Sequence, residues 1–102
     1  MRARAAVLML GLLSSCSHTT VFRLSRPGEE VARALCAEAG PPRELSAREL
    51  ECPVLHQLHF RVRFAGELVW VTAPAGMEAE LAVRLTTLAH RHGLSVQVVE
   101  EH

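Results

Sequence analysis

Hydrophobic and polar residues alternate along this chain at two spacings, and each spacing predicts its own kind of element. In residues 58–64 and 67–73 the alternation has a period of two and is interrupted only at Ala65-Gly66. This pattern is typical of two half-buried strands joined by a tight turn, so it predicts a β-hairpin. Residues 21–24 and 94–99 alternate in the same way and predict a first and a last strand.

Two other segments, residues 29–39 and 77–92, carry apolar residues at spacings of three and four, as one face of a helix does. Glutamates open both segments, where the helix dipole favours negative charge. Gly40-Pro41-Pro42 ends the first segment, and Gly93 is a C-cap glycine for the second. The apolar positions are Val31, Ala32, Leu35, Cys36 and Ala39 in the first, and Met77, Leu81, Leu85 and Leu88 in the second.

The resulting order, βαββαβ, predicts an α+β domain with the ferredoxin-like split βαβ fold. In that fold a four-stranded antiparallel sheet has the strand order 4-1-3-2, and two helices cover one face. A two-residue turn at Ala65-Gly66 pairs Phe64 with Glu67 and Val62 with Val69. The expected core on the sheet comprises Phe22, Leu24, Phe60, Val62, Val69, Val71, Val96 and Val98.

Residues 43–57 give two alternatives that the pattern leaves open. Ser46 and Glu49 have the spacing of a capping box, which favours one helical turn over residues 47–51, ended by Pro53. The other alternative is an irregular loop.

The strands leave a second sheet face that the helices do not cover. Arg23, Arg61, Arg63 and Trp70 fall on it, and Gln97 joins them on the last strand; the predicted register sets Arg61 beside Trp70. Arginine and tryptophan are typical anchors of interfaces, so this arginine–tryptophan face is the predicted binding surface. An ordinary solvated face, or one covered by residues 43–57, remains the alternative.

Phe60-Arg61-Val62-Arg63, followed by the turn glycine Gly66, resembles the aromatic-Arg-Val-Arg strand of SPOR-type peptidoglycan-binding domains. The resemblance implies a βαββαβ layout and binding of envelope glycan through this strand. In those domains the strand leads directly into the second helix, whereas here residues 68–73 intervene.

The N-terminus has the features of an export signal. Arg2 and Arg4 precede nine apolar residues, 5–13, far fewer than the roughly 20 that span a bilayer. The following Leu13-Ser14-Ser15-Cys16 resembles the lipobox of bacterial lipoproteins. That resemblance implies cleavage before Cys16, diacylglycerol on its thiol and an added acyl chain, such as palmitate, on its amino group. The alternative is an ordinary secretory signal, with Cys16 an unmodified thiol.

The lipoprotein interpretation divides the chain into a cleaved signal (residues 1–15), a lipidated polar tether (16–20) and one small domain (21–102). Resemblance to lipoproteins of double-membraned bacteria also implies a location, because the usual inner-membrane retention signal is an aspartate directly after the cysteine. Ser17 stands there instead. We therefore expect attachment to the outer membrane of the cell envelope, facing the periplasm.

Composition narrows the function further. After removal of the signal, nine arginines face eleven glutamates, a balance that argues against nucleic-acid binding. The chain has no lysine, aspartate or tyrosine, and no nucleophile, base and orienting acid stand in a catalytic pattern. We therefore expect a binding or structural accessory subunit with an envelope protein partner, and neither an enzyme nor a cofactor protein.

Cysteines and histidines leave two further possibilities. Cys36 and Cys52 form an even pair in an exported domain, which favours a disulfide, although two buried thiols would also satisfy the pattern. The six histidines include His90, His92 and His102, which are weak candidates for a metal site. Metal sites need three or four converging ligands.

Overall fold

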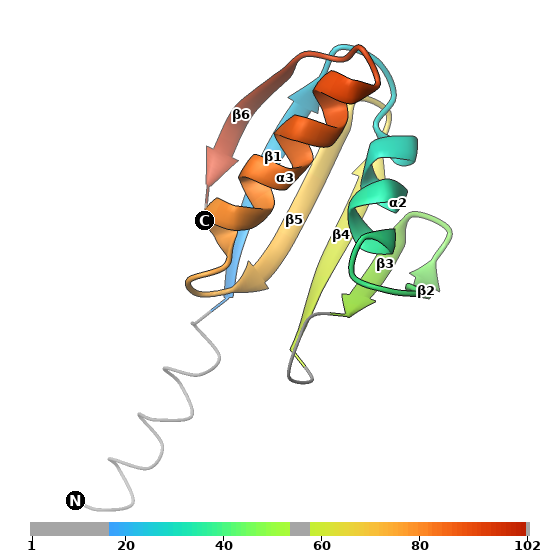
Figure 1. Ribbon diagram of the computed structural model, residues 1–102, viewed down its shortest axis with the longest axis vertical. Helices are drawn as coiled ribbons and strands as arrows, with labels where there is room; N and C mark the ends of the chain where they lie inside the picture. The colour runs from blue at the N-terminus through green and yellow to red at the C-terminus, as the bar shows by residue number, and fades with distance from the viewer. Residues whose placement is uncertain (1–16, 54–57, 102) are drawn as a thin grey trace, which may run out of the picture.

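Antiparallel strands form a single sheet in the computed structural model, which describes residues 17–53 and 58–101 (Figure 1). Within these residues the sheet has six strands in the order β2-β3-β4-β5-β1-β6. The strands are β1 (Ser17–Leu24), β2 (Arg43–Ser46), β3 (Glu49–Pro53), β4 (His59–Ala65), β5 (Leu68–Pro74) and β6 (Val96–Glu101). The helices α2 (Glu29–Ala37) and α3 (Glu78–Arg91) lie side by side on one face of the sheet.

The predicted α+β class, with two helices and an antiparallel sheet, is confirmed. The prediction of four strands is wrong, because β2 and β3 extend the sheet beyond β4. The four strands expected from the sequence are adjacent to one another in the order β6-β1-β5-β4.

Residues 43–53 form the β2–β3 hairpin, so both a helical turn and an irregular loop are wrong for this segment. The Ser46 hydroxyl accepts a hydrogen bond from the backbone N–H of Arg48 at 3.2 Å, and it thereby supports the turn between the strands instead of capping a helix. In β3, Leu50 and Cys52 are fully buried, whereas Glu49 and Glu51, which alternate with them, are half-exposed. This period of two is short, but it is the pattern of a half-buried strand.

The hairpin of β4 and β5 has the predicted faces but a different register. Phe64 lies opposite Val69 and Ala65 opposite Leu68, so the turn residues are Gly66-Glu67. Tight hairpin turns need a positive φ at their first central residue, and Gly66 has φ +56° there, a conformation that would strain Ala65. The register moves by two residues, so every side chain keeps its predicted face.

The core lies between the helices and the sheet. Phe22, Leu24, Phe60, Val62, Val69 and Val71 are buried as predicted, and the helices add Val31, Leu35, Leu81 and Leu85. Val96 is only partly buried. Val98 is 50% exposed, so its assignment to the core is wrong. Val98 lies on β6, which is an edge strand and has no neighbour on its outer side among the strands of residues 17–53 and 58–101.

Strand β1 begins at Ser17, earlier than predicted. Ser17 pairs with Pro74, Thr20 is 6% exposed, and the hydroxyls of Thr19 and Thr72 are 2.9 Å apart. The expectation of a polar tether is therefore wrong for residues 17–20, which belong to the sheet. Threonine is a favourable strand residue, and its hydroxyl pairs across strands, which explains why a polar segment forms a strand here.

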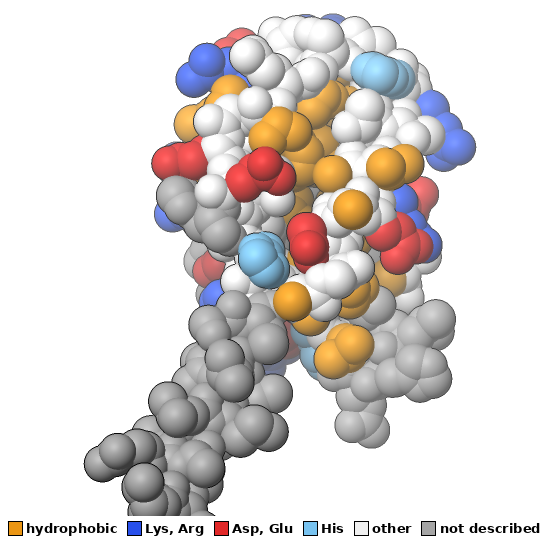
Figure 2. Space-filling model, turned by 90° about the vertical axis from the view of Figure 1, so that its left-hand side faces the viewer, with side chains coloured by type: hydrophobic (Ala, Val, Ile, Leu, Met, Phe, Trp, Pro, Cys, Tyr) orange, Lys and Arg blue, Asp and Glu red, His pale blue; other side chains and the backbone are white. Residues whose placement is uncertain are grey.

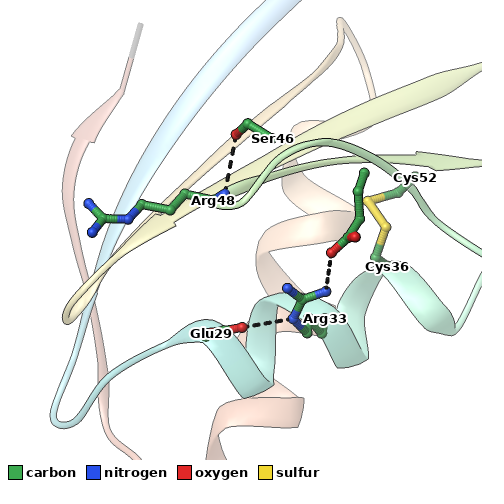
Figure 3. A network of polar contacts seen from close by, with 7 residues as sticks. Glu29, Arg33, Cys36, Ser46, Arg48 and Cys52 are labelled. Carbon is green, nitrogen blue, oxygen red and sulfur yellow. Dashed lines mark hydrogen bonds and ion pairs between the residues drawn. A yellow bond between two sulfur atoms is a disulfide. The ribbon is translucent and has the colours of Figure 1, made fainter.

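A disulfide and an ion pair join helix α2 to the β2–β3 hairpin (Figure 3). Cys36 and Cys52 are joined by a disulfide with an S–S distance of 2.06 Å, and both are fully buried. The Arg33 guanidinium donates to Glu29 at 2.9 Å and to Glu44 of β2 at 3.1 Å, and these hydrogen bonds raise the pKa of Arg33. Because these ions are exposed, the disulfide contributes more to stability than the ion pairs do.

We expect loss of this disulfide to destabilise the domain. A bridge that spans 16 residues stabilises a fold by about 3 kcal/mol in the loop-entropy model. The paired substitution Cys36→Ser with Cys52→Ser should therefore lower the midpoint of urea unfolding. Iodoacetamide labelling of the unreduced, unfolded protein should leave both cysteines unmodified, and labelling of both would contradict the bridge.

Candidate functional site

The arginine–tryptophan face predicted from the sequence exists as one side of the sheet, opposite the helices. Arg23, Arg61 and Arg63 are exposed, and Trp70 is half-buried. The strand registers place Val21, Trp70, Arg63 and Glu49 in one row across four strands. Thr19, Thr72, Arg61, Glu51 and Arg43 form the next row.

Arg63 is the arginine that stacks on Trp70. Its guanidinium carbon lies 4.2 Å from the centre of the indole ring, a cation–π contact. The predicted neighbour was Arg61, and the two-residue shift of the hairpin register accounts for the difference. Val21, opposite Trp70 on β1, is 4% exposed although it lies on the uncovered face. Trp70 is therefore part of a small apolar site within a polar face.

Arg61 lies in the neighbouring row, and its guanidinium forms no ion pair or hydrogen bond with any residue in the described part of the chain. Glu51, directly opposite Arg61, forms its ion pair with Arg43 at 3.1 Å. Arg23 likewise has no such partner among residues 17–53 and 58–101. These two guanidinium groups keep their donors available for an external acceptor.

A shallow depression of about 300 Å³ lies between these rows and is lined by Thr19, Glu49, Arg61, Arg63, Trp70 and Thr72. It combines one aromatic ring, two cations, two hydroxyls and one carboxylate. Such a surface can stack on a flat or apolar group and donate paired hydrogen bonds to a carboxylate beside it.

Glu49 and Glu51 belong to this face, although they were not among its predicted residues. The missed signal is the alternation of Glu49-Leu50-Glu51-Cys52, which is too short to outweigh the capping-box spacing at Ser46. The described part of residues 43–57 lengthens the sheet, so it does not cover the arginine–tryptophan face.

The structure does not bring the candidate metal ligands together in its described part. His90 is exposed, and Nδ1 of His92 lies 3.6 Å from a carboxylate oxygen of Glu30. His102 lies outside the described residues. Within residues 17–53 and 58–101, no three or more histidine, cysteine, aspartate or glutamate side chains are placed to hold a metal ion.

Cys16, the candidate lipidation site, also lies outside the described residues, directly before β1. Neither of the helices in the described part is long and apolar enough to cross a membrane.

Comparison with protein-family models, with curated proteins and with solved structures finds no match to this chain. The two resemblances noted in the sequence therefore rest on residues 13–16 and 60–63 themselves.

We expect substitutions on the two faces of the hairpin to differ in their effect on stability. Phe60→Ala removes a side chain that is 2% exposed and should cost about 3–5 kcal/mol by leaving a core cavity. Trp70→Ala removes a half-buried ring and one cation–π contact, so its cost should be only about 1–2 kcal/mol. Thermal melts of both variants measure the difference, and a larger loss for Trp70→Ala would contradict the assignment of faces.

Proposed function

We propose that this protein is a small lipid-anchored lipoprotein of the cell envelope that acts as a binding or structural accessory subunit. Its arginine–tryptophan face binds an envelope protein partner that presents carboxylates beside an apolar or aromatic group. The observation that carries this proposal is the position of Arg61, an arginine with no described ionic partner, beside the stacked pair of Arg63 and Trp70.

The chemistry of the face supports binding. Tryptophan and arginine are enriched among the residues that dominate binding energy, because each combines a large contact area with directional hydrogen bonds. Stacking on Trp70 restricts the guanidinium of Arg63 before any partner arrives, which lowers the entropy lost on binding. Two carboxylates add negative charge to the face: Glu49 lies opposite Arg63, and Glu51 lies opposite Arg61. They select for a partner whose own positive and negative groups are arranged to match.

The lipobox-like Leu13-Ser14-Ser15-Cys16 supports the anchor, and Ser17 after the cysteine supports the outer membrane, facing the periplasm. We also propose that β6, β1, β5 and β4 with both helices form a ferredoxin-like split βαβ unit, to which β2 and β3 are an addition.

Glycan binding is a second candidate, because Arg61 and Arg63 of the SPOR-like segment both point to the uncovered face. If the partner is peptidoglycan, the lipidated protein should sediment with purified, protein-free sacculi. Sedimentation that depends on Arg61 and Arg63 favours this candidate over a protein partner.

We expect Cys16→Ser to abolish membrane attachment. Each buried methylene of an acyl chain contributes about 0.8 kcal/mol, so two or three chains hold the protein at the membrane almost permanently. The variant should lose incorporation of radiolabelled palmitate and should leave the detergent phase in Triton X-114 partitioning. Unchanged labelling and partitioning would overturn the lipoprotein assignment.

We expect Arg61→Glu to abolish partner binding without unfolding the domain, because the side chain is exposed. A photocrosslinking amino acid at Thr72, between Arg61 and Thr19 in the same row, should give a discrete protein adduct in intact cells. Arg61→Glu should remove that adduct. Arg84→Glu on α3 is the matched control and should leave it unchanged, since Arg84 is an exposed arginine on the helix layer. An adduct that persists in Arg61→Glu would exclude the arginine–tryptophan face as the binding surface.

A further inference from the structure

One end of the sheet lies next to the candidate anchor. Ser17 is the first residue of β1, and it directly follows Cys16 in the sequence. If Cys16 is acylated, no flexible spacer separates the lipid from the sheet. The end of the sheet that contains Ser17 must then lie at the membrane surface.

Several loops and strand ends meet at this end of the molecule. The start of β1, the end of β5 and the start of β4 lie there together (Figure 1), and Ser17 is paired with Pro74. The connection from β5 to α3 adds Ala75 and Gly76, both exposed. Leu58, just before β4, is 47% exposed. Figure 2 shows hydrophobic side chains at this lower end, with acidic and histidine side chains beside them.

The two ends of the domain differ in charge. Residues 17–18, 58–59 and 74–77 contain no arginine or glutamate, and their titratable side chains are those of His18 and His59. The first carboxylate after them, Glu78, accepts a hydrogen bond from the backbone N–H of Gly76 at 2.7 Å. Hydrogen bonds from backbone N–H groups, its own first, lower the pKa of Glu78. The opposite end carries Arg26, Glu29, Glu30 and Glu67, all exposed.

This asymmetry matters because charged groups are costly to dehydrate, whereas small apolar and neutral side chains are not. An end made of Leu58, Pro74 and Ala75 can therefore enter the headgroup layer, and the opposite end cannot do so at similar cost. The contact area is small and would bind a bilayer weakly by itself. An acyl anchor on Cys16 supplies the high effective concentration that makes a weak contact persistent.

We propose that this end, in which Leu58, Pro74 and Ala75 lie around Ser17 and Glu78 is the nearest carboxylate along the chain, docks on the bilayer that holds the lipid of Cys16. The inference rests on the lipid anchor proposed above. It fixes the orientation of the domain: the strands rise from the membrane, and the arginine–tryptophan face points sideways. At about 3.3 Å per residue, the row of Arg61 and Thr72 lies roughly 7 Å above Pro74, and the row of Arg63 and Trp70 roughly 13 Å. The partner of this face must therefore reach the layer directly above the headgroups.

Site-specific quenching tests the docking. Lipidated protein is reconstituted into vesicles of phosphatidylethanolamine and phosphatidylglycerol that contain a headgroup-nitroxide lipid. Ala75→Cys and Glu67→Cys, in the exposed loops at the two ends of β5, are each labelled with the same fluorophore. With Cys36 and Cys52 bridged and Cys16 acylated, the introduced cysteine is the one that labels.

The fluorophore at position 75 should lose several-fold more of its emission than the one at position 67. Adding Leu58→Glu to the Ala75→Cys protein should reduce that loss while the protein stays on the vesicles. Equal quenching at both positions, with the protein retained, would overturn the docking and leave the anchor intact. If the protein is not retained on the vesicles at all, the anchor fails and the docking fails with it.

Discussion

The pairing of β1 with β5 is the interaction on which the rest of this structure depends. It runs along β1 from Ser17 opposite Pro74 to Arg23 opposite Leu68. Because side chains alternate between faces, this one register sets Phe22 and Val69 under the helices and Val21 and Trp70 on the open side. The same pairing brings Ser17 to the end of the sheet that contains the β5–α3 connection.

Much of this arrangement follows from local patterns. The alternation in β4 and β5 predicted the two faces correctly even though the turn was placed one residue early, because a register shift of two preserves the face of every side chain. The helices were predictable from their apolar spacing and their breakers, and α2 and α3 lie within the predicted ranges. Arg23, Arg61, Arg63 and Trp70 were placed on one face for the same reason.

What the sequence did not reveal depends on tertiary contacts. The β2–β3 hairpin is short, and its stability comes from pairing with β4 and from the Cys36–Cys52 bond, neither of which has a local signal. The composition of Ser17–Thr20 is typical of a linker. The segment forms a strand because β5 continues to Pro74 and pairs with each of its residues, from Ser17 opposite Pro74 to Thr20 opposite Val71. Val98 was assigned to the core from periodicity alone, although burial also requires a neighbouring strand, which the edge strand β6 lacks on one side.

The proposed function links these features in space. In the proposed lipoprotein, an acylated Cys16 next to a strand, instead of at the end of a flexible tether, would hold the domain in one orientation. That orientation would present Arg61, Arg63 and Trp70 to partners near the membrane. A fixed orientation would also raise the effective concentration at which the arginine–tryptophan face meets another membrane-attached protein. A shallow depression with a few hydrogen-bond donors would then suffice for a specific contact. The disulfide between α2 and β3 stabilises the strand that carries Glu49 and Glu51.

Amide hydrogen exchange of residues 17–20 in the mature lipidated protein tests the central claim most directly, because the claim requires β1 to begin at Ser17. In an antiparallel pair alternate amides bond to the partner strand, so alternate amides in this segment should exchange far more slowly than those of an unstructured peptide. Exchange of all four amides at the rate of an unstructured peptide would show a flexible tether, and it would contradict both the extent of β1 and the fixed orientation derived from it.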